Sequence, residues 1–263
     1  MKSHSLSPAI VTFSLTLIFS LATASAAPQV FEASGATPAD ILTEVNAFKA
    51  SVSLGGNNNG IVAGPIANGR REINWDGVPD GFAAPNNLPA NFFNSNSPRG
   101  VVFFTPGSGF QVSADSDNPT NTPIEFENLR PGASKKFRTF SPQRLFTAVD
   151  STTMEILFFV PGSHIPATTR GFGAVFTDVD RDDSTKIEYF DVNGALLASE
   201  FVQRAHGNET LSFLGVSFNN PDVFLVRITS GGVRLGEKKH GGKDLVVMDD
   251  FIYGEPVSLV DGS

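Results

Sequence analysis

The carboxyl-terminal half of the chain, residues 171–253, is a succession of short apolar runs separated by turn residues. The runs GFGAVFTDVD, SFLGVSF, VFLVRI and DLVVMDDFIYG are rich in β-branched and aromatic residues, and Gly, Asn, Asp or Pro bounds each of them. Such runs are typical of successive antiparallel strands. An Asn193-Gly194 turn between the runs IEYF and ALLASEFV also predicts a β-hairpin. This half of the chain therefore restricts the fold to β-rich architectures.

The amino-terminal half continues the pattern and adds one helix. Further strands are predicted at residues 70–75, 124–126, 143–149 and 154–160, and a hairpin at residues 101–114 turning at 106–109. Thr37-Pro38-Ala39-Asp40 has the sequence of a capping box with Pro at the first helical position, which predicts a short helix over about residues 38–50. The expected fold class is all-β: a two-sheet antiparallel β-sandwich of jelly-roll type with one short N-terminal helix.

The first 26 residues have the organisation of an export signal. Lys2 precedes an apolar run at residues 9–22, and Ala24-Ser25-Ala26 fits a small-x-small cleavage site. We expect cleavage after Ala26 and a secreted, extracellular protein. No later apolar segment approaches the length of a membrane span, so we expect no span in the mature chain. Residues 27–263 are long enough for a single sandwich domain.

Composition narrows the classes of partner. The net charge of −8 at pH 7 argues against nucleic acid and anionic lipid, which need a basic surface, and favours neutral glycans or bound cations. With no Cys, disulfides and thiolate chemistry are excluded. The sequence contains no Gly-x-Ser-x-Gly elbow, His-Glu-x-x-His motif or phosphate-binding loop. A non-catalytic protein is therefore the expectation.

Two acidic groups are candidate calcium ligands. Asp178, Asp180 and Asp182 alternate along a turn, so their carboxylates can converge on one hard cation; the alternative is a solvated loop between strands. Asp249 and Asp250 are adjacent within an apolar strand, so one of them should face the core. A buried carboxylate needs hydrogen bonds or a cation. Structural calcium and a plain salt bridge or hydrogen-bonding role both remain open.

Long polar loops are the candidate ligand-binding segments. Residues 86–99 and 115–121 are rich in Asn, Asp, Ser and Pro, and loops of this length are often functional. Trp75, the single tryptophan, is either a sugar-stacking platform or a core aromatic. The candidate ligand-binding residues are Trp75, Asn86, Asn87, Asn94, Asn96 and Arg99.

Residues 168–255 resemble a β-sandwich module of exported bacterial proteins, many of which carry a PEP-CTERM sorting tail. The resemblance is carried by GFGAVFTDVD, the hairpin with Asp-x-Asn-Gly, SFLGVSF and VVMDDFIYG. It implies a lectin-like or galactose-binding-like fold, with Asp249 or Asp250 as ligands where calcium is present. The sequence after residue 256 shows no Pro-Glu-Pro, apolar tail or basic cluster, so free secretion is expected.

Taken together, these observations predict a secreted binding protein for carbohydrate or extracellular matrix material, without catalysis and with a structural calcium as an added element. Two alternatives stay open. One is a structural or adhesive matrix protein with a Phe-rich surface; the other is an extracellular polysaccharide or ester hydrolase, which would need facing carboxylates or a Ser/His/acid set in a pocket.

Overall fold

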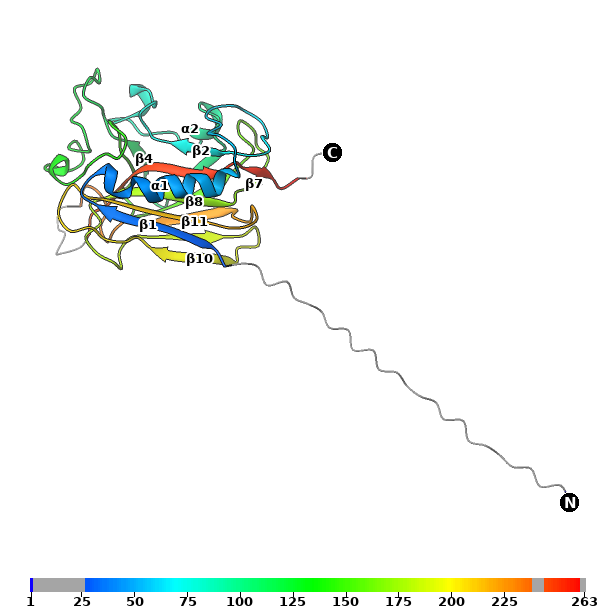
Figure 1. The fold of residues 1–263 in the computed structure, drawn as a ribbon. Helices are drawn as coiled ribbons and strands as arrows, with labels where there is room; N and C mark the ends of the chain where they lie inside the picture. The colour runs from blue at the N-terminus through cyan, green and yellow to red at the C-terminus, as the bar shows by residue number, and fades with distance from the viewer. Residues whose placement is uncertain (2–26, 238–243, 261–263) are drawn as a thin grey trace.

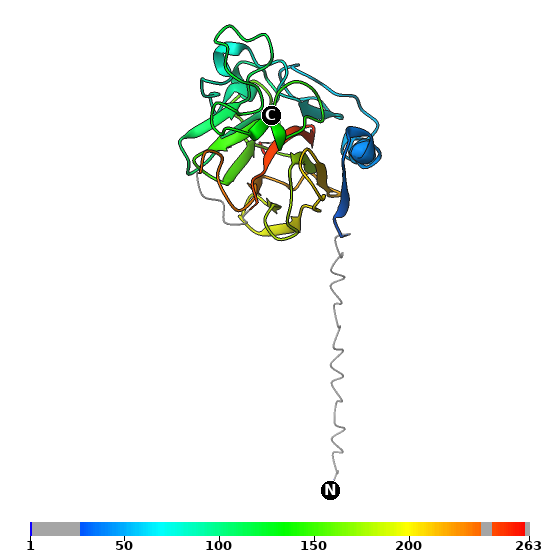
Figure 2. The same ribbon diagram turned by 90° about the vertical axis from the view of Figure 1, so that its left-hand side faces the viewer.

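The computed structural model describes Met1, residues 27–237 and residues 244–260. The predicted signal peptide therefore lies, apart from Met1, outside the described residues. The described chain forms two main antiparallel sheets, as expected for a β-sandwich (Figures 1 and 2). A two-stranded ribbon of β7 (Ala167–Thr168) and β14 (Val257–Ser258) adds to them.

The larger sheet has seven strands. Their order is β1 (Gln29–Gly35), β11 (Leu211–Ser217), β8 (Gly171–Thr177), β13 (Val247–Gly254), β5 (Phe146–Val149) and β4 (Gly109–Val112), while β2 (Arg70–Ile73) also pairs with β13. The strands β8, β11 and β13 are buried at every residue, which is the pattern of strands covered on both faces.

The smaller sheet has five strands. Their order is β10 (Leu196–Phe201), β9 (Lys186–Phe190), β12 (Leu225–Thr229), β6 (Thr153–Phe158) and β3 (Val101–Phe104). The predicted Asn-Gly hairpin joins β9 to β10 and is confirmed, with the amide of Gly194 donating to the carbonyl of Asp191 at 3.0 Å. In β9, β12 and β6 buried residues alternate with half-buried ones, so one face of this sheet packs on the core.

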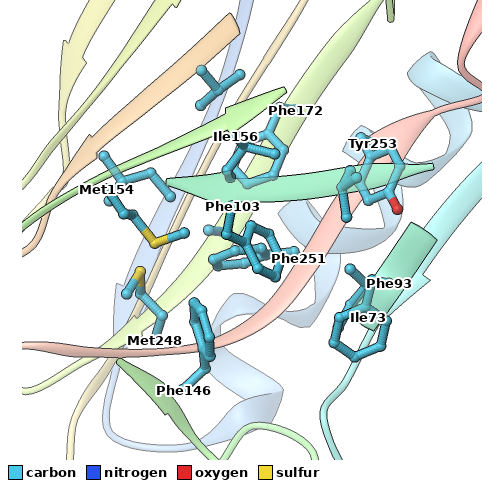
Figure 3. Packing of buried hydrophobic residues seen from close by; sticks show 14 of the residues in the cluster. Ile73, Phe93, Phe103, Phe146, Met154, Ile156, Phe172, Met248, Phe251 and Tyr253 are labelled. Atoms are coloured by element: carbon cyan, nitrogen blue, oxygen red, sulfur yellow. The ribbon is translucent and has the colours of Figure 1, made fainter. Parts of the chain in front are cut away.

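An aromatic core fills the space between the two sheets. Phe103, Phe146 and Phe251 meet at its centre, with centroids of Phe103 and Phe146 5.3 Å apart (Figure 3). Met154 and Met248 lie at one end of the view, and Phe93 and Ile73 lie together at the other. Phenylalanine suits this role because it fills volume without bringing a polar atom that needs a partner.

The N-terminal helix forms as predicted and runs slightly further, as α1 (Pro38–Ser53). Asp40 Oδ2 accepts the Thr37 amide at 2.8 Å, which satisfies a free donor at the helix start. The helix lies alongside β1 (Figure 1) and packs its apolar face, including Val45 and Phe48, onto the outer face of the larger sheet. The fold is thus a sandwich with one helix covering one outer face.

The shorter helical turns lie in the loops. They are η1 (Asp80–Phe82), η2 (Ala133–Lys135) and α2 (Phe92–Ser95). α2 interrupts the loop predicted at residues 86–99, because Phe92 and Phe93 are both buried in the main core.

Two strand predictions are wrong. Residues 101–104 and 109–112 do not form a hairpin: β3 pairs with β6 and β4 pairs with β5, so the turn between them carries the chain from one sheet to the other. Both segments still bury alternate residues in the same core, from opposite sides. Residues 124–126 form no strand, because Glu125 and Phe126 have positive φ values of 50° and 63°.

Candidate functional site

The turn after β2 carries the tryptophan that was a candidate stacking residue. Trp75 is 1% exposed, and its ring is stacked on Phe146 with 3.9 Å between ring centroids. Phe93 and Phe251 pack against it edge-on, and its Nε1 donates to the main-chain oxygen of Asp249 at 2.9 Å. Trp75 is therefore a core residue and has no exposed ring face on which a sugar could stack.

A pocket of about 230 Å³ opens next to this tryptophan. It lies between the turn after β2 and the segment that contains α2. Trp75 in the turn packs against Phe93 in α2, and this contact joins the two segments. Ile61 contributes an exposed apolar side chain, while Asn74, Ser97 and Arg99 contribute polar groups. Concave sites with apolar walls and a few polar groups are the usual form of small-ligand sites. Of the candidate ligand-binding residues, Trp75 and Arg99 both line this pocket.

Arg99 is the charged residue of the pocket. Its guanidinium lies over the Phe93 ring, 5.4 Å from the centroid. Nε donates to the main-chain oxygen of Glu72 at 2.9 Å, and Nη1 donates to the hydroxyl of Ser97. Burial, aided by the positive charge of Arg71, lowers the pKa of Arg99 below its usual value. Among the described residues, Arg99 forms no ion pair with a carboxylate.

The carboxylates around this pocket are already paired with other cations. Glu72 accepts Lys49 at 2.8 Å and Arg70 at 2.6 Å. Glu255 is bound in a two-pronged pair by the fully buried Arg71, with contacts of 2.7 and 2.6 Å. These pairs leave the guanidinium in the pocket without a compensating negative charge.

The predicted asparagines do not gather into one site. Asn94 is 5% exposed and holds α2 in place, since its Nδ2 donates to the Ser163 carbonyl at 2.7 Å and its Oδ1 accepts the Gly162 amide at 3.1 Å. The exposed ones, none of which lines the pocket, are Asn86, Asn87 and Asn96. Ser97 lies in the loop predicted to bind the ligand, although it was not singled out, whereas no motif or spacing marked Asn74.

Hydrogen bonds and an ion pair within the chain hold the loop at residues 115–121 in place. Asn118 is 9% exposed and donates to the carbonyls of Asp115 and Thr122. Asp115 in turn accepts the buried guanidinium of Arg144 at 2.5 Å. These contacts give the loop a structural role in the described chain.

The adjacent acids Asp249 and Asp250 occupy a β-bulge in β13. The pairing with β8 shifts between Met248 and Phe251, so both acids stand opposite a single residue, Val175. Met248 and Phe251 face the main core, while both carboxylates meet the loop at residues 138–144 outside it. The expectation that adjacent strand residues place one of these acids toward the core is wrong, because the bulge breaks the alternation.

Both carboxyls are engaged by that loop. Asp249 Oδ2 accepts the amide of Phe140 at 2.6 Å and that of Ser141 at 3.3 Å, and the Ser141 hydroxyl donates to Asp250 Oδ1 at 2.6 Å. Burial, followed by the charge of Asp250, raises the pKa of Asp249 well above its usual range. Burial also raises the pKa of Asp250, against hydrogen bonds from Ser141 and Asp249. Both carboxyls are therefore harder to ionise than exposed ones.

The acids of the other group do not converge as the alternating spacing suggested. Asp178 is fully buried, with Oδ2 3.3 Å from Lys136 Nζ and with no hydrogen-bond partner for Oδ1. Burial raises its pKa to about 7 despite the opposing charge of Lys136. Asp180 and Asp182 are exposed. Asp244, far along the chain, comes to this group instead, and its Oδ1 accepts the Asp180 amide at 3.1 Å.

Calcium requires six to eight oxygen ligands around one point. In the part of the chain that the structure describes, no group of three or more His, Asp or Glu side chains is placed to hold one metal ion. Oδ2 of Asp249 accepts two main-chain amides, its Oδ1 lies 3.4 Å from the Ser141 hydroxyl, and Asp178 already meets an ammonium group. Neither group is an assembled calcium cage, and calcium binding stays a prediction.

Comparisons with known proteins do not assign the chain to a family. No family model matches it, and no curated protein matches it. Among solved structures, the enzymatically active domain of Bacteriophage CBA120 tailspike protein 4 aligns over 68% of this chain and 22% of its own, with 12% identity and a TM-score of 0.23. That TM-score supports no conclusion about fold or activity.

Proposed function

We propose that this is an exported, non-catalytic protein that binds carbohydrate, and that the pocket at Arg99 holds part of the ligand. The observation that carries the proposal is the pocket itself, in which guanidinium, amide and hydroxyl groups line one concave site. Sugars present many hydroxyls that both donate and accept hydrogen bonds, so such a polar lining suits them. Export and the resemblance of residues 168–255 to exported modules stay predictions that agree with this role.

The lining of the pocket favours binding over hydrolysis. Hydrolysis of a glycosidic bond uses two carboxyl groups facing each other. No carboxylate is among the described residues that line the pocket, and His164 and His206 are exposed elsewhere on the chain.

None of the helices in the described part of the chain has the length and apolar character of a membrane span.

Blocking the pocket tests the proposal. Gly77 lines the pocket, and a Cβ built there meets no atom within 4 Å, so Gly77→Gln adds a bulky side chain at the edge of the pocket without a clash. We expect retention on insoluble polysaccharides to fall about tenfold, the equivalent of about 1.4 kcal/mol of binding free energy. Gly81→Gln is the matched control, because Gly81 is equally open but lies outside the pocket.

The proposal is wrong if the natural chain shows only background retention across a broad polysaccharide panel, or if Gly77→Gln binds as well as Gly81→Gln. Co-sedimentation and a glycan array provide the two readouts.

A matrix or adhesive role has one observation in its favour. The edge strands of the smaller sheet expose Phe104, Leu196 and Phe201, each 47% or more exposed. An edge strand that exposes apolar side chains can pair with another copy of the chain. Light scattering that rises with protein concentration in the absence of glycan would support this role in place of the carbohydrate-binding one.

A further inference from the structure

We propose that the group bound by Arg99 is the carboxylate of an acidic sugar, so that the ligand is a uronate-containing saccharide. This inference rests on the proposed function and refines it. The acidity of the whole chain favoured neutral glycans, whereas the pocket has the opposite local charge.

The first step is the missing counter-charge. A guanidinium withdrawn from water costs free energy unless a negative group compensates it. Arg99 is partly withdrawn into the pocket, and its partners are a main-chain carbonyl, a hydroxyl and the face of Phe93, all of them uncharged. An anion that enters the pocket would supply the negative charge that these neutral partners lack.

The second step is that the carboxylates near the pocket are already paired with other cations. Glu72 is held by Lys49 and Arg70, and the carboxylate of Glu255 by Arg71. Glu72 offers only its main-chain oxygen to Arg99. Arg99 is therefore an unpaired cation, while the nearby carboxylates are neutralised by other cations. The net charge around the pocket is positive.

The third step concerns geometry. A guanidinium has five N–H donors in a planar fork, and the two bonds to Glu72 and Ser97 leave three of them for a ligand. A carboxylate is planar and accepts such donors in pairs. The net charge of −8 also repels a doubly charged phosphate more than a singly charged carboxylate. Asn74 and Ser97 remain beside the fork for the sugar hydroxyls.

The test compares one oligosaccharide in two charge states. Isothermal titration calorimetry is run with an oligouronate and with the same oligosaccharide after its carboxyls are reduced to neutral hydroxymethyl groups. We expect the natural chain to bind the oligouronate at least about tenfold more tightly, the usual range for a charged hydrogen bond. Arg99→Gln should abolish that preference, and Arg99→Lys, which keeps the charge without the fork, should keep part of it.

Arg227→Gln is the matched control, because the Arg227 guanidinium also lies over a phenylalanine ring, that of Phe190, but is paired with Glu155 and lies outside this pocket. It should keep the preference. Equal binding of both saccharides by the natural chain, or a preference that survives Arg99→Gln, overturns the carboxylate inference and leaves carbohydrate binding standing. Binding of neither saccharide, together with background retention across the polysaccharide panel, removes the proposed function itself. An otherwise neutral oligosaccharide that carries a sulfate group is the further comparison. If it binds as tightly as the oligouronate, any single negative charge suffices, and the carboxylate assignment is overturned.

Discussion

At the scale of single residues, charged groups hold the loops of this protein to its sheets. The loop at residues 138–144 is attached through Asp249 and Asp250, and the buried Arg71 joins β2 to Glu255. Each group replaces water with several protein partners, so removing one partner leaves the others unsatisfied. The sequence marked Asp249 and Asp250 as a candidate calcium site. In this structure they hold a loop to the sheet by hydrogen bonds.

The Asp249 side chain gives a direct test of that role. Asp249→Ala removes the acceptor of the Phe140 and Ser141 amides and should lower the free energy of unfolding by about 2–4 kcal/mol. Asp249→Asn keeps an acceptor and a donor without charge, so its effect should be much smaller. Urea unfolding at pH 7 measures both. An asparagine variant as unstable as the alanine variant would show that the carboxylate charge is needed, as a bound cation would require.

At the scale of elements, the helix α1 packs closely on the larger sheet at Phe48 because two glycines of the sheet lie beneath that side chain. Gly173 of β8 and Gly215 of β11 are paired in register, and the Phe48 ring lies over both. A Cβ on Gly215 would be 2.7 Å from the ring of Phe48, closer than van der Waals contact allows. These glycines set how closely the helix packs.

Gly215→Ala should therefore destabilise the protein by about 1–3 kcal/mol, the usual cost of overpacking. Thermal unfolding by circular dichroism measures the loss. Combining it with Phe48→Leu should recover part of the stability, because a smaller side chain relieves the clash. Gly81→Ala, at an open position, is the neutral control. If Gly215→Ala and Gly81→Ala unfold alike, the helix does not pack on these glycines as described.

At the scale of the whole molecule, buried carboxyls make stability depend on pH. Burial raises the pKa of Asp178 and of Glu125 to about 7 in each case, and it raises the pKa of Asp249, Asp76 and Asp244 as well. Between the ordinary carboxyl pKa and these raised values, the folded chain binds more protons than the unfolded chain. Stability is thus greatest near the lower end of this range and falls as pH rises through it.

We therefore expect the melting temperature to fall by several degrees between pH 5 and pH 8, since each proton difference is worth about 1.4 kcal/mol per pH unit. Scanning calorimetry across this range measures it. Asp178→Asn should flatten the curve, because it removes one of the groups that titrate. A melting temperature that rises from pH 5 to pH 8 would contradict this assignment of the buried acids.

The sequence by itself determined the features that depend on neighbours along the chain. The all-β class, the helix started by Thr37 and Asp40, and the hairpin turned by Asn193-Gly194 all follow from local spacing, capping and turn preferences.

Tertiary structure alone decided the rest, because the deciding contacts join residues far apart in the chain. Trp75 is buried by Phe146 and Phe251, and β3 and β4 separate because each finds a different partner strand. The bulge that turns Asp249 and Asp250 to one side appears only when β13 pairs with β8. Arg99 was a candidate from its loop, but its lack of a counter-charge depends on which cations hold Glu72 and Glu255. Local preferences cannot specify such choices, since they are made by packing and charge pairing in the assembled fold.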